Sequence, residues 1–60
     1  MKWYYKDFST FLGINNKKVV EFLNALSDAN IPTERIKIVC MDMNWLTVYY
    51  YATKEIKDGN

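Results

Sequence analysis

The spacing of hydrophobic residues changes along the chain from a strand pattern to a helix pattern and back again. Residues 2–8, KWYYKDF, are rich in aromatic strand formers and lack glycine and proline, which predicts a first strand. Further on, hydrophobic residues recur at i, i+3, i+4 and i+7 as Val19, Phe22, Leu23 and Leu26. This spacing predicts an amphipathic helix of about four turns.

The ends of this helix and a following hairpin are marked by specific residues. Asn15 or Asn16 suits the N-cap, Asn30 suits a left-handed exit, and Pro32 prevents continuation. Residues 35–42, RIKIVCMD, then alternate with period two, and residues 45–53, WLTVYYYAT, are β-branched and aromatic. A short turn, DMN, joins these two stretches, so we expect a β-hairpin.

The predicted order β-α-β-β places the protein in the α+β class. We expect one domain over residues 1–60: a three-stranded sheet with one amphipathic helix on one face and a frayed tail over residues 55–60. A single helix covers one face of such a sheet, so the other face is expected to be open.

Strand alternation assigns side chains to these two faces. We expect Phe8 to tuck under the loop that follows the first strand. The side chains expected under the helix are Trp3, Tyr5, Ile36, Ile38, Cys40, Leu46, Val48, Tyr50 and Ala52. Those expected on the open face are Lys2, Tyr4, Lys6, Lys37, Val39, Met41, Trp45, Thr47, Tyr49, Tyr51 and Thr53. A contiguous apolar patch of several hundred Å² on a surface usually indicates a binding site.

Length and composition favour self-association. A 60-residue chain buries only about 60% of the surface that its unfolded form exposes, and small domains are often supported by disulfides, metals or oligomers. Cys40 is the single cysteine and there is no histidine, which excludes an internal disulfide and a structural zinc site. We therefore predict a homo-oligomer, with a dimer as the first choice. The predicted interface comprises Tyr4, Lys37, Val39, Met41, Trp45, Thr47, Tyr49 and Tyr51.

The same composition argues against catalysis. Without histidine the commonest general base is missing, the acids are dispersed, and Gly13 and Gly59 are isolated rather than part of a phosphate-binding loop. The net charge is +1. We predict a cytoplasmic, non-catalytic, regulatory binding module without cofactor, metal or membrane partner.

Two other binding functions use the same face. Nucleotide or single-stranded nucleic-acid binding would stack bases on Tyr4, Tyr49 and Tyr51 and hold phosphates with lysines. The predicted phosphate contacts are Lys2, Lys6 and Lys37. The second alternative is inhibition of a larger host protein, as in phages or mobile elements, through the same aromatic cluster.

The start of the chain resembles a known family. MKWYYKDF, with Trp3, Tyr5 and Lys6, is similar to the W-x-Y-K start of a family of very small bacterial, archaeal and phage domains of unknown function. The helical VVEFLNAL and the closing TVYYYATK extend the resemblance over most of the chain, whereas NIPTERIKIV, residues 30–39, departs from the family pattern. The resemblance implies a β-α-β-β fold and brings no established activity.

Overall fold

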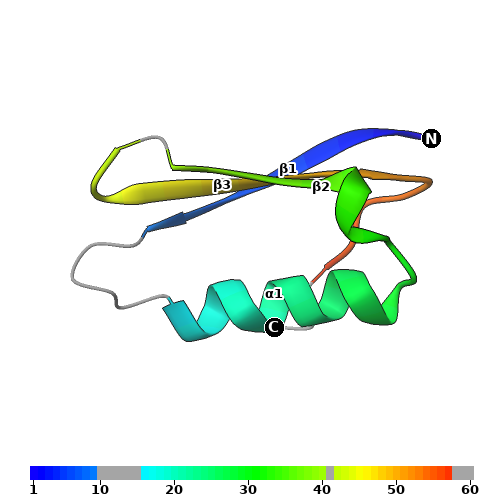
Figure 1. Cartoon of the computed structure of the whole chain (residues 1–60), viewed down its shortest axis with the longest axis horizontal. Helices are drawn as coiled ribbons and strands as arrows, with labels where there is room; N and C mark the ends of the chain where they lie inside the picture. The colour runs from blue at the N-terminus through cyan, green and yellow to red at the C-terminus, as the bar shows by residue number, and fades with distance from the viewer. Residues whose placement is uncertain (10–15, 41, 58–60) are drawn as a thin grey trace.

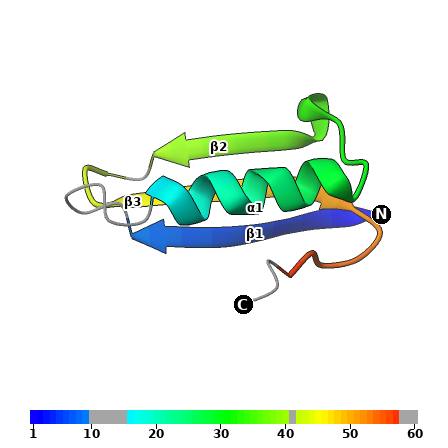
Figure 2. The same cartoon turned by 90° about the horizontal axis from the view of Figure 1, so that it is seen from below.

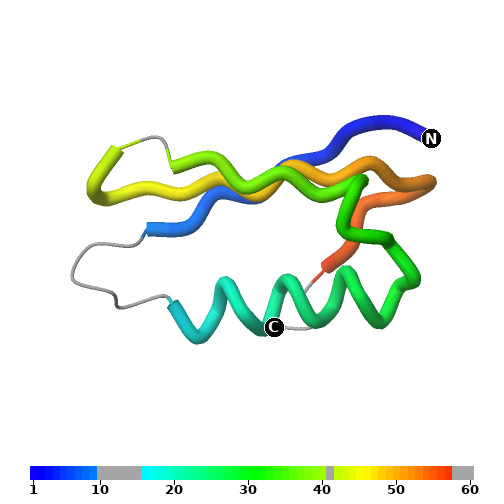
Figure 3. The backbone as a smooth tube through the Cα atoms, in the orientation of Figure 1, coloured from blue at the N-terminus to red at the C-terminus, as the bar shows by residue number. Residues whose placement is uncertain are grey.

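The computed structural model describes residues 1–9, 16–40 and 42–57 and confirms the α+β fold with the order β-α-β-β. Figure 1 shows a sheet with one helix packed along one side of it, and Figure 3 traces the same path of the chain. The elements are β1 (Lys2–Ser9), α1 (Asn16–Asp28), a 3₁₀ turn η2 (Thr33–Arg35), β2 (Ile36–Cys40) and β3 (Trp45–Ala52).

The sheet is antiparallel with β3 in the centre, so the order across it is β1-β3-β2. The hairpin β2–β3 closes through an Asx turn, in which the backbone N–H of Asn44 donates to Oδ1 of Asp42 at 2.6 Å. Figure 2 shows α1 running along β3 and in front of it, with β1 on one side and β2 on the other. The central strand is therefore covered best, and β1 and β2 are both edge strands.

Helix α1 follows the predicted hydrophobic spacing. Val19, Phe22 and Leu26 point into the core. The helix ends in a Schellman motif, in which Ile31 N–H donates to the Leu26 carbonyl and Asn30 N–H to that of Ser27, at 3.1 and 2.9 Å. Asn30 has φ 64°, as the left-handed exit requires. Of the two residues predicted as the N-cap, Asn16 is the first residue of α1 and Asn15 lies outside the described residues.

The core joins α1 to β1 and β3 through three aromatic rings. Phe22 is fully buried, with ring centroids 5.7 Å from Phe8 and 5.6 Å from Tyr50. Val48 and Tyr50 belong to the set predicted to lie under the helix, and both are buried there. Pairs of this geometry contribute about 0.5–1.5 kcal/mol beyond the area they bury.

The assignment of faces in β1 was predicted the wrong way round. Phe8 belongs to the strand and is buried in the core, so the side chains two and four residues before it, Lys6 and Tyr4, also face α1. Tyr4 stacks on Tyr50 with centroids 5.6 Å apart. Trp3 and Tyr5, expected inside, lie on the opposite face and are 50% and 63% exposed.

The predicted burial of β2 also needs correction. Ile36, Ile38 and Cys40 alternate on one face as expected, and Ile36 packs against the core. However, Ile38 is 49% exposed and Cys40 is exposed. The reason is that α1 lies over β3 rather than over the edge strand (Figure 2), which leaves a groove between α1 and the residues Ile36 and Ile38 of β2.

The tail predicted to fray is attached to the core at Ile56. Its backbone N–H donates to the Tyr50 hydroxyl at 2.9 Å, and its side chain packs against the core cluster. Burial of the ring raises the pKa of Tyr50 above its ordinary value, an effect that the hydrogen bond to Ile56 partly opposes. Residues 58–60 of the predicted tail lie outside the described part of the chain.

Candidate functional site

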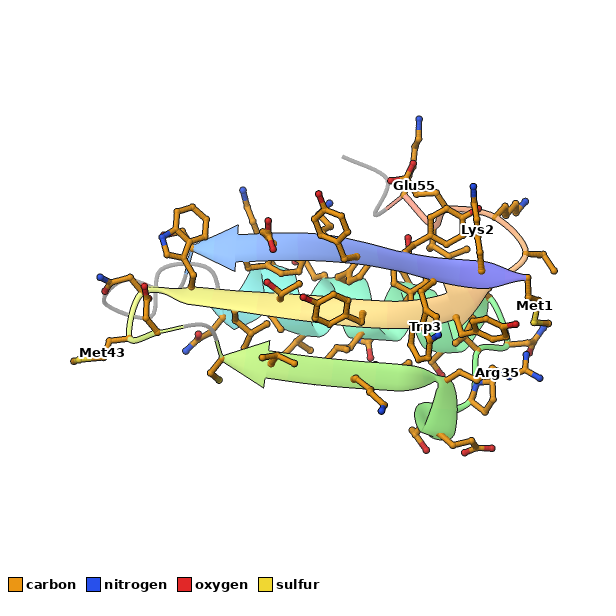
Figure 4. All side chains as sticks on the ribbon, turned by 90° about the horizontal axis from the view of Figure 1, so that it is seen from above. Met1, Lys2, Trp3, Arg35, Met43 and Glu55 are labelled. Carbon is orange, nitrogen blue, oxygen red and sulfur yellow. The ribbon has the colours of Figure 1, made fainter. Side chains whose placement is uncertain are left out.

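The face of the sheet that points away from α1 carries a cluster of aromatic side chains, which we call the aromatic face. β1 contributes two members and β3 contributes three, all at alternate positions of their strands. Figure 4 views the molecule from this side and shows Trp3 on the surface of the sheet. The aromatic face comprises Trp3, Tyr5, Trp45, Tyr49 and Tyr51.

The strand register arranges these rings in cross-strand rows. Trp3 lies opposite Tyr51 with ring centroids 5.3 Å apart, and Tyr5 lies opposite Tyr49 at 6.3 Å. Both pairs are tilted rather than parallel, a favourable arrangement for neighbouring rings. Each ring therefore contacts a neighbour on the adjacent strand, and together the rows form a continuous aromatic surface across β1 and β3.

A partly buried hydrogen bond lies beside these rows. Thr47 in the central strand is only 3% exposed, although it sits on the face that the helix does not cover. Its hydroxyl donates to Oδ1 of Asp7, directly opposite on β1, at 2.6 Å. The bond satisfies the buried hydroxyl and links β1 to β3, and it places a carboxylate on a face that was predicted to carry no acid.

The charges around the aromatic face differ from those predicted. Lys37 lies opposite Tyr49 and is exposed on this face. Lys2 and Lys6 are on the helix side, where their ammonium groups lie over the rings of Tyr4 and Phe8 at 5.4 and 5.7 Å. Of the three predicted phosphate contacts, one therefore remains beside the exposed rings, and Asp7 offsets its charge.

The structure brings together most of the predicted interface and adds to it. Lys37, Val39, Trp45, Thr47, Tyr49 and Tyr51 lie on the open face as expected. Tyr4 does not, since it packs against the core, and Met41 lies outside the described residues. The residues missed by the sequence analysis are Trp3, Tyr5 and Asp7. Phe8 was the available signal, because counting its side chain among those under the helix fixes the alternation of β1.

A second surface feature lies on the other side of the sheet. A groove of about 300 Å³ runs between α1 and β2. Its lining is apolar or uncharged and comprises Leu23, Ser27, Ile31, Thr33, Ile36 and Ile38. The groove exists because α1 leaves the helix-facing side of β2 partly uncovered.

The described residues contain no group of three or more Cys, Asp or Glu side chains arranged to hold a metal ion.

Cys40, expected to be a buried hydrophobic residue, is exposed at the end of β2.

No helix within the described ranges is long and apolar enough to cross a membrane.

Comparison of the chain with protein families, curated proteins and solved structures finds no match in any of the three. The resemblance to the W-x-Y-K family stays a prediction, so the function has to be argued from the surface itself.

Proposed function

We propose that this protein is a non-catalytic, regulatory interaction module of the cytoplasm that binds another protein through its aromatic face. The observation that carries the proposal is the pair of cross-strand rows, Trp3 with Tyr51 and Tyr5 with Tyr49. Trp3, Tyr5 and Trp45 are each about half exposed or more. Large apolar surface left open on a small chain is typical of a binding site.

The chemistry of the face favours a protein partner. Tryptophan and tyrosine dominate the residues whose truncation weakens protein interfaces most, because they bury much area with few rotatable bonds. Val39, 41% exposed, extends the apolar surface onto β2. The tyrosine hydroxyls can hydrogen-bond at the rim of an interface while the rings are buried.

The charges make nucleic acid a weaker candidate. Binding to a phosphate backbone depends on several cations along the strand, and most of its affinity is lost as salt rises. Here Lys37 stands beside the rings, Lys2 and Lys6 are on the opposite side of the sheet, and Asp7 is on the aromatic face. Inhibition of a larger protein uses the same aromatic contacts and is one form of the proposed function.

The test is affinity capture from an extract of the cells that encode the protein. The bait variant is Tyr5→Ala with Tyr49→Ala, which removes one row of rings. Lys17→Ala is the matched control, since Lys17 is exposed on α1, on the far side of the sheet. We expect one defined protein to be retained by the native chain and by the control, at low and high salt, and to be lost from the double variant.

Two results would overturn the proposal. One is retention of the same protein by the double variant, since the row of rings would then be dispensable. The other is capture of nucleic acid that is lost steeply as salt rises, which would favour the phosphate-binding alternative. Circular dichroism of each bait ensures that a loss of binding is not a loss of folding.

A further inference from the structure

The outer edge of β2 is open to pairing with another strand. β2 lies at the end of the sheet, and no strand of the described chain pairs with its outer side. Its sequence, IKIVC, contains one charge, at Lys37, and no proline. Natural proteins usually protect edge strands with charges, prolines, bulges or a covering segment. This edge has little of that protection, so its backbone N–H and C=O groups are available to a further strand.

The uncovered edge is continuous with an uncharged stripe of α1. The groove between α1 and β2 is lined on the helix side by Leu23 and Ser27. At helical spacing, Asn16 and Val20 continue this line toward the start of the helix. None of the four is charged, and Val20 is 55% exposed. The charged residues of α1, including Lys17 and Glu21, fall on its other sides by the same spacing.

We infer that a second copy of this chain docks on the edge, pairing its β2 antiparallel to the first around a two-fold axis at Ile38. In this register Ile36 lies opposite Cys40 of the second copy, and Lys37 lies opposite Val39. It is the symmetric register in which all five residues of β2 pair. If the second strand were shifted by two residues, so that the axis lay at Lys37, the two copies of Lys37 would lie opposite each other, which is unfavourable.

Self-complementarity distinguishes a second copy from other strands. A two-fold interface places each surface against its own copy, so a charged stripe would repel itself, and the stripe along α1 is uncharged. The other edge strand, β1, is less suited because it carries Lys2, Lys6 and Asp7.

The available surface is also large enough. The Cα trace of the whole chain extends 33 × 21 Å in the plane parallel to this side, and β2 with the stripe of α1 occupies part of that area. The smaller specific protein interfaces bury roughly 600 Å² per partner. Pairing would cover the exposed half of Ile38, the groove behind it and the unpaired backbone groups of β2.

The symmetry of this dimer has a functional consequence. A two-fold axis perpendicular to the sheet joins the two sheets into one of six strands, with both α1 helices on the same side. Both aromatic faces then lie together on the opposite side and form a bivalent surface. Two linked sites can raise apparent affinity by about 10²–10⁴ for a partner with two matching sites. This consequence rests on the proposed function, whereas the dimer itself does not.

Sedimentation velocity of the native chain and of two charge-matched variants tests the dimer. Ile38→Lys sets two ammonium groups against each other on the axis, while Asn24→Lys adds the same charge on the exposed side of α1. In the hundred-micromolar range we expect the native chain and Asn24→Lys to sediment at twice the 7.1 kDa chain mass. Ile38→Lys is expected to sediment as a monomer with an unchanged circular dichroism spectrum.

Disulfide crosslinking tests the register. In the proposed pairing the Cα atoms of residue 38 lie about 4.5–5.5 Å apart, within disulfide range. The two Cys40 residues lie about 14 Å apart along the ladder, out of range. Ile38→Cys with Cys40→Ser is therefore expected to crosslink under mild oxidation, and the native chain is not.

Three outcomes would overturn the inference: a native chain that sediments as a monomer, a dimeric Ile38→Lys variant, or crosslinking through native Cys40 at the same rate. Dissociation by Tyr5→Ala with Tyr49→Ala would also contradict it, because those residues lie outside the proposed interface. Retention of the partner by Tyr5→Ala with Tyr49→Ala, with an intact dimer, overturns the proposed function alone, so the two failures can be distinguished.

Discussion

Tyr4 and Tyr5 are adjacent, have the same side chain and lie on opposite faces of β1, so their replacement tests the assignment of the aromatic face. Tyr4 is partly buried, packs against the core and stacks on Tyr50 at 5.6 Å. Tyr5 is 63% exposed and contacts the ring of Tyr49 at a centroid distance of 6.3 Å. We expect Tyr4→Ala to destabilise the protein substantially more than Tyr5→Ala.

The magnitudes follow from burial. Replacing a fully buried large aromatic residue with alanine costs about 3–5 kcal/mol, so the partly buried Tyr4 should lose about 2–3 kcal/mol. Tyr5 should lose about 1 kcal/mol, the contribution of one exposed aromatic pair. A chain of this length has a total stability of about 3–9 kcal/mol, so the two variants should differ clearly.

Urea unfolding followed by circular dichroism, at one protein concentration for all variants, measures the difference. With a slope of about 1 kcal/mol/M, the midpoints of Tyr4→Ala and Tyr5→Ala should be separated by about 1–2 M. The milder pair Tyr4→Leu and Tyr5→Leu gives the same comparison if Tyr4→Ala does not fold. Equal midpoints, or a larger loss for the Tyr5 variants, would refute the assignment of faces.

Three further predictions concern the core and the strand contacts. Phe22→Leu removes the ring contacts to Phe8 and Tyr50, so it should lower the thermal midpoint and reduce the free energy of unfolding by about 1–2 kcal/mol. Phe22→Ala should reduce the free energy of unfolding by about 3–5 kcal/mol. Thr47→Val should lose about 1 kcal/mol in urea unfolding, and a double-mutant cycle with Asp7→Ala should show the two effects to be non-additive. Because the pKa of Tyr50 is raised in the folded protein, the unfolded chain releases this proton first. The free energy of unfolding should therefore fall above about pH 10, by up to about 1.4 kcal/mol per pH unit. Tyr50→Phe should remove the part of this fall that comes from the titration of Tyr50.

The sequence predicted the parts of the fold that depend on local pattern. The spacing of Val19, Phe22 and Leu26 defined the buried side of α1, and Asn30 marked its end. In β3, the alternation separated the buried Tyr50 from Tyr49 on the open face. Each of these features is set within a few neighbouring residues.

The errors arose where aromatic residues occur on both faces of a strand or where coverage depends on packing. In β1, Trp3 and Tyr5 alternate with Tyr4, so hydrophobicity alone did not decide which set is buried, and the side chain of Phe8 was expected under the following loop rather than under α1. The exposure of Ile38 depends on where α1 lies across the sheet, which no local pattern specifies. The Thr47–Asp7 bond joins residues 40 positions apart and follows from the strand register.

Site-specific photo-crosslinking tests the central claim, that the aromatic face binds a protein, most directly. A benzophenone amino acid replaces Tyr5 in one protein and Glu21, exposed on α1, in another. We predict that one cellular protein crosslinks from position 5 and not from position 21, and that excess native chain suppresses the product while Tyr5→Ala with Tyr49→Ala does not. Equal crosslinking from both positions, or competition by the double variant, would contradict the account.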